Sequence, residues 1–246
     1  MDSTYPKISK LGEQSILIQF TPKISEALLD EILYIQEKLK RFYKDKNVEI
    51  SNSYREILVL YNSELINIES DFKDLKKLLA GITYNTKQKK EQTIFEIPVC
   101  YDAQFGIDLD YISNTNHIAV SDIIKLHTQA LYRVYFMGFL PGFLYLGGLN
   151  KKLHISRKSQ PRLKIEKGAV GIGEQQTGIY PQESPGGWQI IGNCPIDFFD
   201  KSKEVPSPIQ AGDFIKFFPV SIAEYKDIKE KVKQQQYQLK STKYDR

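Results

Sequence analysis

The chain of 246 residues has few of the side chains that bind metals or form disulfides. It contains two cysteines, Cys100 and Cys194, and three histidines, and none of these forms a local ligand pair. We therefore expect no structural metal. Two cysteines in a chain of this length fit a reducing compartment, where both would serve as packing residues.

Long apolar runs and a strong charge of one sign are also missing. No uninterrupted apolar stretch approaches the roughly 18 residues of a membrane helix, and no apolar signal core follows the start of the chain. The net charge of +4 is too small to indicate nucleic-acid binding. We expect a soluble, cytoplasmic protein that binds neither membranes nor nucleic acid.

The common nucleotide-binding and nucleophile motifs are absent. No glycine is followed directly by lysine, which excludes a phosphate-binding P-loop. The pair Gly171 and Gly173 is followed by a glycine at 178 rather than 176, so the dinucleotide fingerprint fails. No serine or cysteine occupies a Gly-x-Ser-x-Gly elbow. Nucleotide chemistry, if this protein takes part in it, must come from a partner.

Hydrophobic periodicity predicts an N-terminal domain over residues 1–90. Its order of strand, helix, strands and helix is typical of a small α/β sandwich. The polar stretch 84–92 predicts a linker to the rest of the chain. The expected elements are a strand over 15–20, a helix from the N-cap Thr21 and first-turn Pro22 to about Phe42, strands over 47–61, and a helix over 65–79 that Gly81 ends.

The pattern changes after the linker, so the chain as a whole belongs to the α+β class. Residues 91–222 contain one clear helix, from the N-cap Ser121 to about Arg133, and otherwise short apolar runs between Gly and Pro turns. This pattern indicates a closed or nearly closed β-barrel domain. Residues 223–246, rich in Lys and Gln, predict a basic solvated tail or a short frayed helix.

Glycine is concentrated in one part of this second domain. Eleven of the fifteen glycines lie between Phe136 and Asp200. Glycine is costly to order, and it is needed where backbone takes positive φ or lies against a group that a Cβ would block. This density predicts a functional site.

These segments resemble one family: the B subunit of bacterial 5-oxoprolinase, sporulation-kinase inhibitor and allophanate hydrolase subunit 1, also called the carboxyltransferase C/D subdomain family. In two places the sequence departs from the family pattern, which usually has small residues at Glu174 and Gln175 and Thr at Cys194. The resemblance implies a cyclophilin-like barrel. It rests on Leu131-Tyr132-Arg133-Val134, Gly138-Phe139-Leu140-Pro141-Gly142-Phe143, Pro161-Arg162, Gln176-Thr177-Gly178-Ile179-Tyr180, Ser184-Pro185-Gly186-Gly187-Trp188 and Gly192-Asn193-Cys194-Pro195.

Two of these motifs carry polar groups suited to a site. The N-H groups of Gly186 and Gly187 could converge on an anion or oxyanion beside Ser184, although a tight hairpin is the simpler interpretation. At strand spacing, Gln176, Gly178 and Tyr180 share one face, so an amide and a phenol could address one pocket with Thr177 nearby; the alternative is that Tyr180 packs and Gln176 pairs with backbone.

Other candidates are single residues. His127 shares a helical face with Ile123 and Leu131, which predicts a core histidine, while the family's His-Thr pair keeps it a candidate for positioning or proton transfer. Arg162 is the candidate anchor for a substrate carboxylate or a partner. The resemblance adds three residues of the 138–143 motif to the substrate-binding or interface set: Pro141, Gly142 and Phe143.

The family resemblance implies the B subunit of an ATP-dependent 5-oxoprolinase, a hydrolase that opens 5-oxo-L-proline to L-glutamate. It implies partner subunits A and C, and ATP used by the complex, with this chain inactive alone. One alternative is a regulatory binding module that inhibits a sensor histidine kinase. A prolyl isomerase rests on fold analogy alone. Neighbouring A and C subunit genes would favour the enzyme, and a neighbouring kinase gene the inhibitor.

Overall fold

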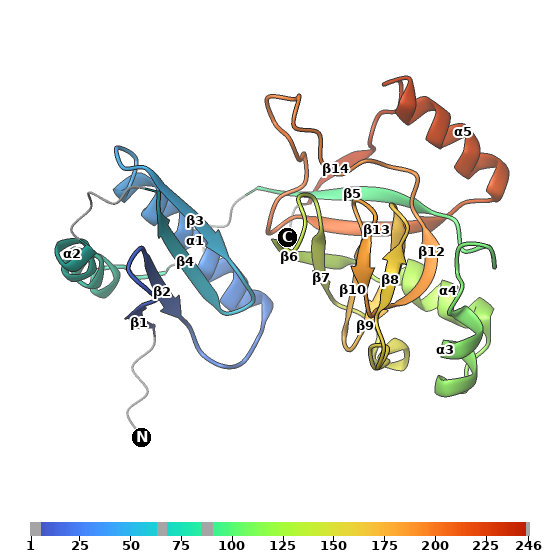
Figure 1. Cartoon of the computed structure of the whole chain (residues 1–246), viewed down its shortest axis with the longest axis horizontal. Helices are drawn as coiled ribbons and strands as arrows, with labels where there is room; N and C mark the ends of the chain where they lie inside the picture. Colours follow the sequence, from blue (N-terminus) through green and yellow to red (C-terminus); the bar gives the residue numbers. More distant parts are fainter. Residues whose placement is uncertain (1–5, 63–67, 85–90, 245–246) are drawn as a thin grey trace. The chain divides into compact units, whose positions relative to one another are not determined.

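A computed structural model describes residues 6–62, 68–84 and 91–244 of the chain (Figure 1). The chain divides into two compact units, residues 1–90 and residues 91–246. The stretch expected to be a linker falls largely on residues 85–90, which lie outside the described residues.

The described part of the first unit is an antiparallel sheet, with the order β1-β2-β4-β3, and two helices. Strands β2 and β4 bury every second residue, and the helices contribute leucines and isoleucines to the same core. The first strand, β1, was not expected from the sequence. The elements are β1 (Lys7–Lys10), β2 (Ser15–Gln19), α1 (Glu26–Phe42), β3 (Val48–Asn52), β4 (Glu56–Tyr61) and α2 (Ile68–Ala80).

Helix α1 begins later than predicted. Its N-cap is Ser25, whose Oγ accepts a hydrogen bond from the backbone N of Leu28 at 3.1 Å. Thr21 and Pro22 lie before the helix, so the predicted cap was wrong. Both serine and threonine are good caps. The one that starts the helix is the one directly before the buried stripe, which opens at Leu28.

The second unit is built on a large sheet with the order β12-β9-β10-β7-β6-β13-β5-β14, and a small β11-β8 sheet lies beside it. Figure 1 shows α3 and α4 next to each other and α5 apart from them. The elements are β5 (Gln92–Val99), α3 (Leu109–Asn116), α4 (Val120–Gln129), β6 (Tyr132–Met137), β7 (Leu144–Gly147), the 3-10 turn η1 (Lys151–Leu153), β8 (Arg162–Ile165), β9 (Ala169–Gly173), β10 (Gln176–Ile179), β11 (Ser184–Gly186), β12 (Gln189–Asn193), β13 (Phe214–Pro219), α5 (Ile222–Lys233) and β14 (Ser241–Tyr244).

The large sheet curves around an apolar core. Cys100, directly after β5, exchanges backbone hydrogen bonds of 2.9 and 3.0 Å with Asn193 at the end of β12. This contact brings one edge strand of the sheet to the far end of β5. Ile97, Leu146 and Ile172 lie in the enclosed core. The described residues form a single bridge here and not a ladder, so the closed barrel stays a prediction.

Two sequence predictions for the second unit were wrong at the helices. The helix expected over residues 121–133 is α4, which ends at Gln129, and the chain then enters β6. The reason is tertiary: the aromatic and β-branched residues from Tyr132 onwards are buried in the sheet. Helix α3 was not predicted.

The predicted basic tail is structured. Helix α5 begins with a capping box, in which Ser221 and Glu224 each satisfy the other's backbone N-H. Its Tyr225 is buried and donates a hydrogen bond to Asn193 Oδ1 at 2.9 Å. Strand β14 then pairs with β5. Residues 222–244 therefore complete the second unit. None of the described helices is long and apolar enough to cross a membrane.

Candidate functional site

Strand β10 separates two environments. Thr177 is completely buried on the inner side, where it contacts His127. Gly178 and Tyr180 lie on the outer side and both contact Trp188. Gln176 shares their side by the two-residue repeat of a strand. The predicted alternation of this motif is confirmed, but Thr177 faces away from the outer residues.

Trp188 explains much of the glycine content. A Cβ on Gly173 would lie 2.5 Å from Trp188 Nε1, and a Cβ on Gly178 would lie 3.1 Å from Trp188 Cζ3. Both distances are too short for another residue without displacement of the ring. The prediction that the glycine backbone lies against a blocking group is therefore confirmed on β9 and β10, and the group is a side chain of the same chain.

Around the indole the chain forms what we call the outer aromatic cluster. Its rings meet edge to face, with centroids 5.3 Å apart for Phe143 and Tyr180 and 5.5 Å apart for Phe143 and Trp188. The Arg157 guanidinium lies 5.7 Å from the centre of the Trp188 ring. The buried members are Phe143, Ile165, Ala169, Tyr180, Trp188 and Ile190, with Leu140 and Tyr145 partly buried against them.

Tyr180 is a protonated phenol in this cluster. Burial raises its pKa to about 12, and the positive charges of Arg157 and Arg162 only partly offset that rise. A Cβ on Gly186 would lie 2.4 Å from the Tyr180 Oη, so only glycine fits beside the hydroxyl. At neutral pH the phenol can donate a hydrogen bond but cannot act as a base.

The Ser184 to Gly187 segment does not form the tight hairpin considered as its simpler interpretation. Strand β11 pairs with β8 and not with the following β12. Gly187 O accepts a hydrogen bond from Lys158 N at 2.7 Å. Ser184 is 8% exposed, and its Oγ has no hydrogen-bond partner within the part of the chain that the structure describes. The Oε1 of Gln176 is buried and unpaired in the same sense.

Arg162 already holds a carboxylate of its own chain. Its Nη1 and Nη2 donate to Asp108 Oδ2 and Oδ1 at 2.8 and 2.7 Å, a bidentate pair. Asp108 is 4% exposed and also accepts from Ile190 N at 2.7 Å, and Lys158 Nζ lies 3.7 Å from it. The guanidinium is therefore not free to bind a substrate carboxylate in this arrangement. Sequence analysis missed Asp108, because no local pattern links residues 54 positions apart.

His127 lies in the inner core and is completely buried. Its Nδ1 lies 2.7 Å from Tyr101 Oη and its Nε2 lies 3.0 Å from Thr177 Oγ1. Burial lowers the pKa of the ring to about 3. This geometry agrees with the alternative of a satisfied core histidine. Tyr101, the other partner of the ring, was not singled out from the sequence.

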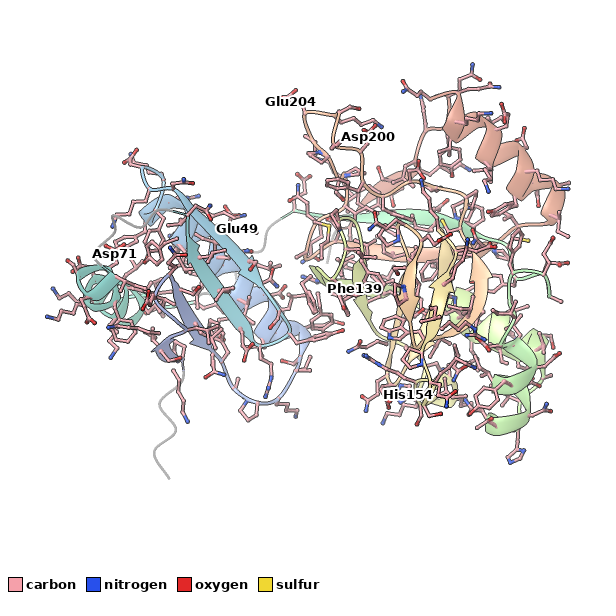
Figure 2. The ribbon with its side chains drawn as sticks, viewed as in Figure 1. Glu49, Asp71, Phe139, His154, Asp200 and Glu204 are labelled. Atoms are coloured by element: carbon pink, nitrogen blue, oxygen red, sulfur yellow. The ribbon has the colours of Figure 1, made fainter. Side chains whose placement is uncertain are left out.

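Pro141 and Gly142 line an open, largely apolar hollow of about 530 Å³ between the turn after β6 and the loop that follows Phe198. Gly142 has φ +84°, and a Cβ on it would lie 2.9 Å from Phe199 Cβ. Phe139, labelled in Figure 2, is 62% exposed and has φ 67°. The full lining is Met137, Gly138, Phe139, Leu140, Pro141, Gly142, Phe199, Pro206 and Ser207.

The acidic turn that departs from the family pattern has a structural role. Glu174 has φ 57° and exchanges backbone hydrogen bonds of 2.8 and 3.2 Å with Ile155. Its carboxylate accepts a bond from Arg157 N at 3.4 Å. Glu174 thus holds the segment that carries Arg157 against the β9-β10 turn.

Metal-binding chemistry has no support from the described side chains. Among them, no three His, Cys, Asp or Glu residues come together as a possible metal site. Cys100 and Cys194 are buried and free, and burial raises the pKa of the Cys194 thiol to about 12. Neither thiol is activated as a nucleophile or ligand.

A strongly curved sheet with an aromatic cluster on its outer side, joined to a small sheet-and-helix unit, is the architecture of carboxyltransferase subdomains. Residues 6–209 match the carboxyltransferase domain, subdomains C and D. The urea carboxylase of Kluyveromyces lactis has the same fold, with a TM-score of 0.81 at 20% identity, over 96% of this chain and 24% of that one.

The chain belongs to the family of carboxyltransferase subdomains C and D, so the resemblance based on its motifs is confirmed. It is similar to the 5-oxoprolinase B subunit of Bacillus subtilis, with 34% identity over 91% of this chain and 97% of the relative. The 5-oxoprolinase B subunit of Haemophilus influenzae is 43% identical over 60% of this chain and 70% of the relative.

Proposed function

We propose that this chain is the B subunit of a bacterial ATP-dependent 5-oxoprolinase, a hydrolase complex that converts 5-oxo-L-proline to L-glutamate. One observation carries the proposal: the similarity to the B subunit of a 5-oxoprolinase extends over 97% of that relative's length. A match over a whole chain supports a shared role better than a match confined to one shared domain.

The chemistry of the reaction supports a need for partners. A lactam is a stable amide and must be activated before water can attack it, for example by transfer of a phosphoryl group to its oxygen. The chain has no phosphate-binding loop. We therefore assign ATP binding to partner subunits A and C, which act together with this chain in the cytoplasm.

On this chain we assign the substrate-facing role to the outer side of β10. An amide side chain such as Gln176 complements a lactam, because each offers one N-H donor and one C=O acceptor. The protonated Tyr180 hydroxyl is a donor for an oxygen that gains negative charge. Leaving Gln176 Oε1 and Ser184 Oγ buried and unpaired costs roughly 1 to 3 kcal/mol each, a cost that functional sites often retain.

The test is reconstitution from purified subunits. We expect no ATP-dependent release of glutamate from 5-oxoproline by this chain alone and none by subunits A and C without it. The three subunits together should be active. Glutamate release by the lone chain at the rate of the full set, or full activity without it, would contradict the proposal.

A second candidate function is a regulatory module that inhibits a sensor histidine kinase. The exposed apolar hollow beside Phe139 favours it, because apolar surface of this kind is typical of protein-binding sites. Autophosphorylation of a sensor kinase encoded next to this chain tests it directly. Inhibition at equimolar chain, with no reconstituted 5-oxoprolinase activity, would favour the module over the enzyme.

A further inference from the structure

A hydrogen-bond chain crosses the inner core of the second unit. Tyr101 Oη and His127 Nδ1 are 2.7 Å apart, and His127 Nε2 and Thr177 Oγ1 are 3.0 Å apart. Thr177 Oγ1 then donates to Gly171 O at 2.9 Å. The chain thus links the segment after β5 with α4, β10 and β9. All three side chains are buried, so the bonds are protected from competition by water.

The direction of each bond follows from the threonine. Its hydroxyl has one hydrogen, and this hydrogen goes to the carbonyl oxygen of Gly171. Toward His127, Thr177 Oγ1 can therefore only accept. The network assigns the ring hydrogen to Nε2, and Nδ1 accepts from the Tyr101 hydroxyl.

The histidine ring is held from its faces as well as its edges. Phe217 stacks on it with centroids 4.6 Å apart and planes 21° apart. Tyr132 packs at 5.4 Å, and its hydroxyl donates to the backbone oxygen of His127 at 2.9 Å. The ring is neutral, completely buried and fully paired, so it cannot exchange protons with a substrate.

The far end of this chain reaches the support of the outer aromatic cluster. Thr177 lies between Gln176 and Gly178 in β10, and its hydroxyl bonds to Gly171 in β9. Gly171 and Gly178 both lie against Trp188, where a Cβ would be 3.2 Å from its Cβ and 3.1 Å from its Cζ3. A shift of Thr177 on the inner side must therefore move the surface on which the indole rests.

We propose that His127 is a positioning residue, which as its Nε2-H tautomer fixes Thr177 and so holds Gln176 and the glycine support of Trp188 in place. The consequence for catalysis rests on the proposed function. The tautomer and the link to Trp188 do not, and they can be measured on the chain alone.

The first experiment is nitrogen-15 NMR of the full chain, which has three histidines. The signals are assigned by comparison with His117→Gln and His154→Gln variants. We expect His127 to be neutral with its hydrogen on Nε2, and unchanged between pH 8 and pH 5. A hydrogen on Nδ1, or titration within this range, would overturn the assignment.

The second experiment uses the single tryptophan as a reporter. Thr177→Ser keeps the hydroxyl and should preserve the Trp188 emission spectrum, whereas Thr177→Val removes it and should shift the spectrum. His127→Gln should shift it too. Wild-type emission in both Thr177→Val and His127→Gln would overturn the positioning role. If Thr177→Val does not fold, the His127→Gln and Thr177→Ser spectra decide.

The catalytic consequence is measured in the reconstituted complex. Loss of position by about 1 Å can lower a rate by about a hundredfold, so we expect Thr177→Val to lower kcat at least tenfold. The pH dependence of kcat should keep its shape in His127→Gln, because the ring transfers no proton. Loss of one limb of that profile would make His127 a catalytic acid or base and contradict the inference. An inactive wild-type complex, with the NMR and emission results as expected, would count only against the proposed function.

Discussion

The two sides of strands β9 and β10 differ in how they treat polar groups. On the inner side, the hydroxyls and the ring nitrogens of Tyr101, His127 and Thr177 all have partners. On the outer side, Gln176 Oε1 and Ser184 Oγ are buried without a partner among the described residues. The inner side is thus complete by itself, and the outer side is not. This difference teaches that position, more than residue type, separates support from function here.

The largest effect expected from breaking this comparison is at Trp188. Truncation of a buried aromatic side chain typically costs about 3 to 5 kcal/mol, and Trp188 is 5% exposed with glycines shaped to it. Trp188→Ala should lower the free energy of unfolding by that amount, measured by denaturant titration. Trp188→Phe is the control and should lose less. A loss below about 1 kcal/mol in Trp188→Ala would show that the cluster does not depend on the indole.

A somewhat smaller loss is expected at Arg162. Its removal leaves the carboxylate of Asp108 buried with only Ile190 N and the more distant Lys158. Breaking a buried pair typically costs about 3 kcal/mol or more, and Arg162, with a quarter of its side chain exposed, should lie at the low end of this range. Thermal melts of Arg162→Ala test this.

The matched control for Arg162 is the double variant Arg162→Ala with Asp108→Ala. It removes both charges and should recover part of the lost stability. An Arg162→Ala protein as stable as the wild type would show that the pair contributes nothing, and would free the guanidinium for a ligand.

The inner side predicts a pH dependence of stability. The pKa of His127 is about 3 in the folded protein, and a free histidine has about 6.5. Below about pH 6.5 the unfolded chain binds a proton that the folded chain does not. Stability should therefore fall as pH falls from 6.5 toward 3, by about 1.4 kcal/mol per pH unit for this group.

The measurement is the free energy of unfolding of wild type and His127→Gln at pH 6.5 and pH 5. Over that interval the wild type should lose about 2 kcal/mol more than the variant. Equal losses in the two proteins would mean that His127 is not held in the neutral form.

The smallest effect is expected at Phe139, at the exposed turn after β6. The side chain is 62% exposed and its φ of 67° suits asparagine better than phenylalanine. Phe139→Asn should change the free energy of unfolding by less than about 0.5 kcal/mol. A clear loss of stability would show that the ring packs more than its exposure indicates.

Local features of the fold could be predicted from the sequence. The apolar stripes of α1 and α2 and the stop at Gly81 follow from spacing within one helix. The alternation of Gly178 and Tyr180 follows from spacing within one strand. The β6 segment was assigned to a helix instead, because only burial against β13 and β7 makes it a strand.

Pairings between distant segments could not be predicted. Asp108 and Arg162 are joined across 54 residues, and Tyr225 of α5 bonds to Asn193 of β12. No spacing rule connects such residues in one sequence. For the same reason the glycine-rich motifs indicated a site without showing that Trp188 itself fills the space over them.

The central claim is that the outer side of β10 carries the function, and Gln176→Ala in the complex with subunits A and C tests it most directly. The substitution removes a buried, unpaired oxygen, so the melting temperature should stay the same or rise. ATP-dependent glutamate release should fall by about tenfold or more, the effect of losing one hydrogen bond of about 1.4 kcal/mol in the transition state. A Gln176→Ala complex with unchanged melting temperature and full activity would contradict the claim.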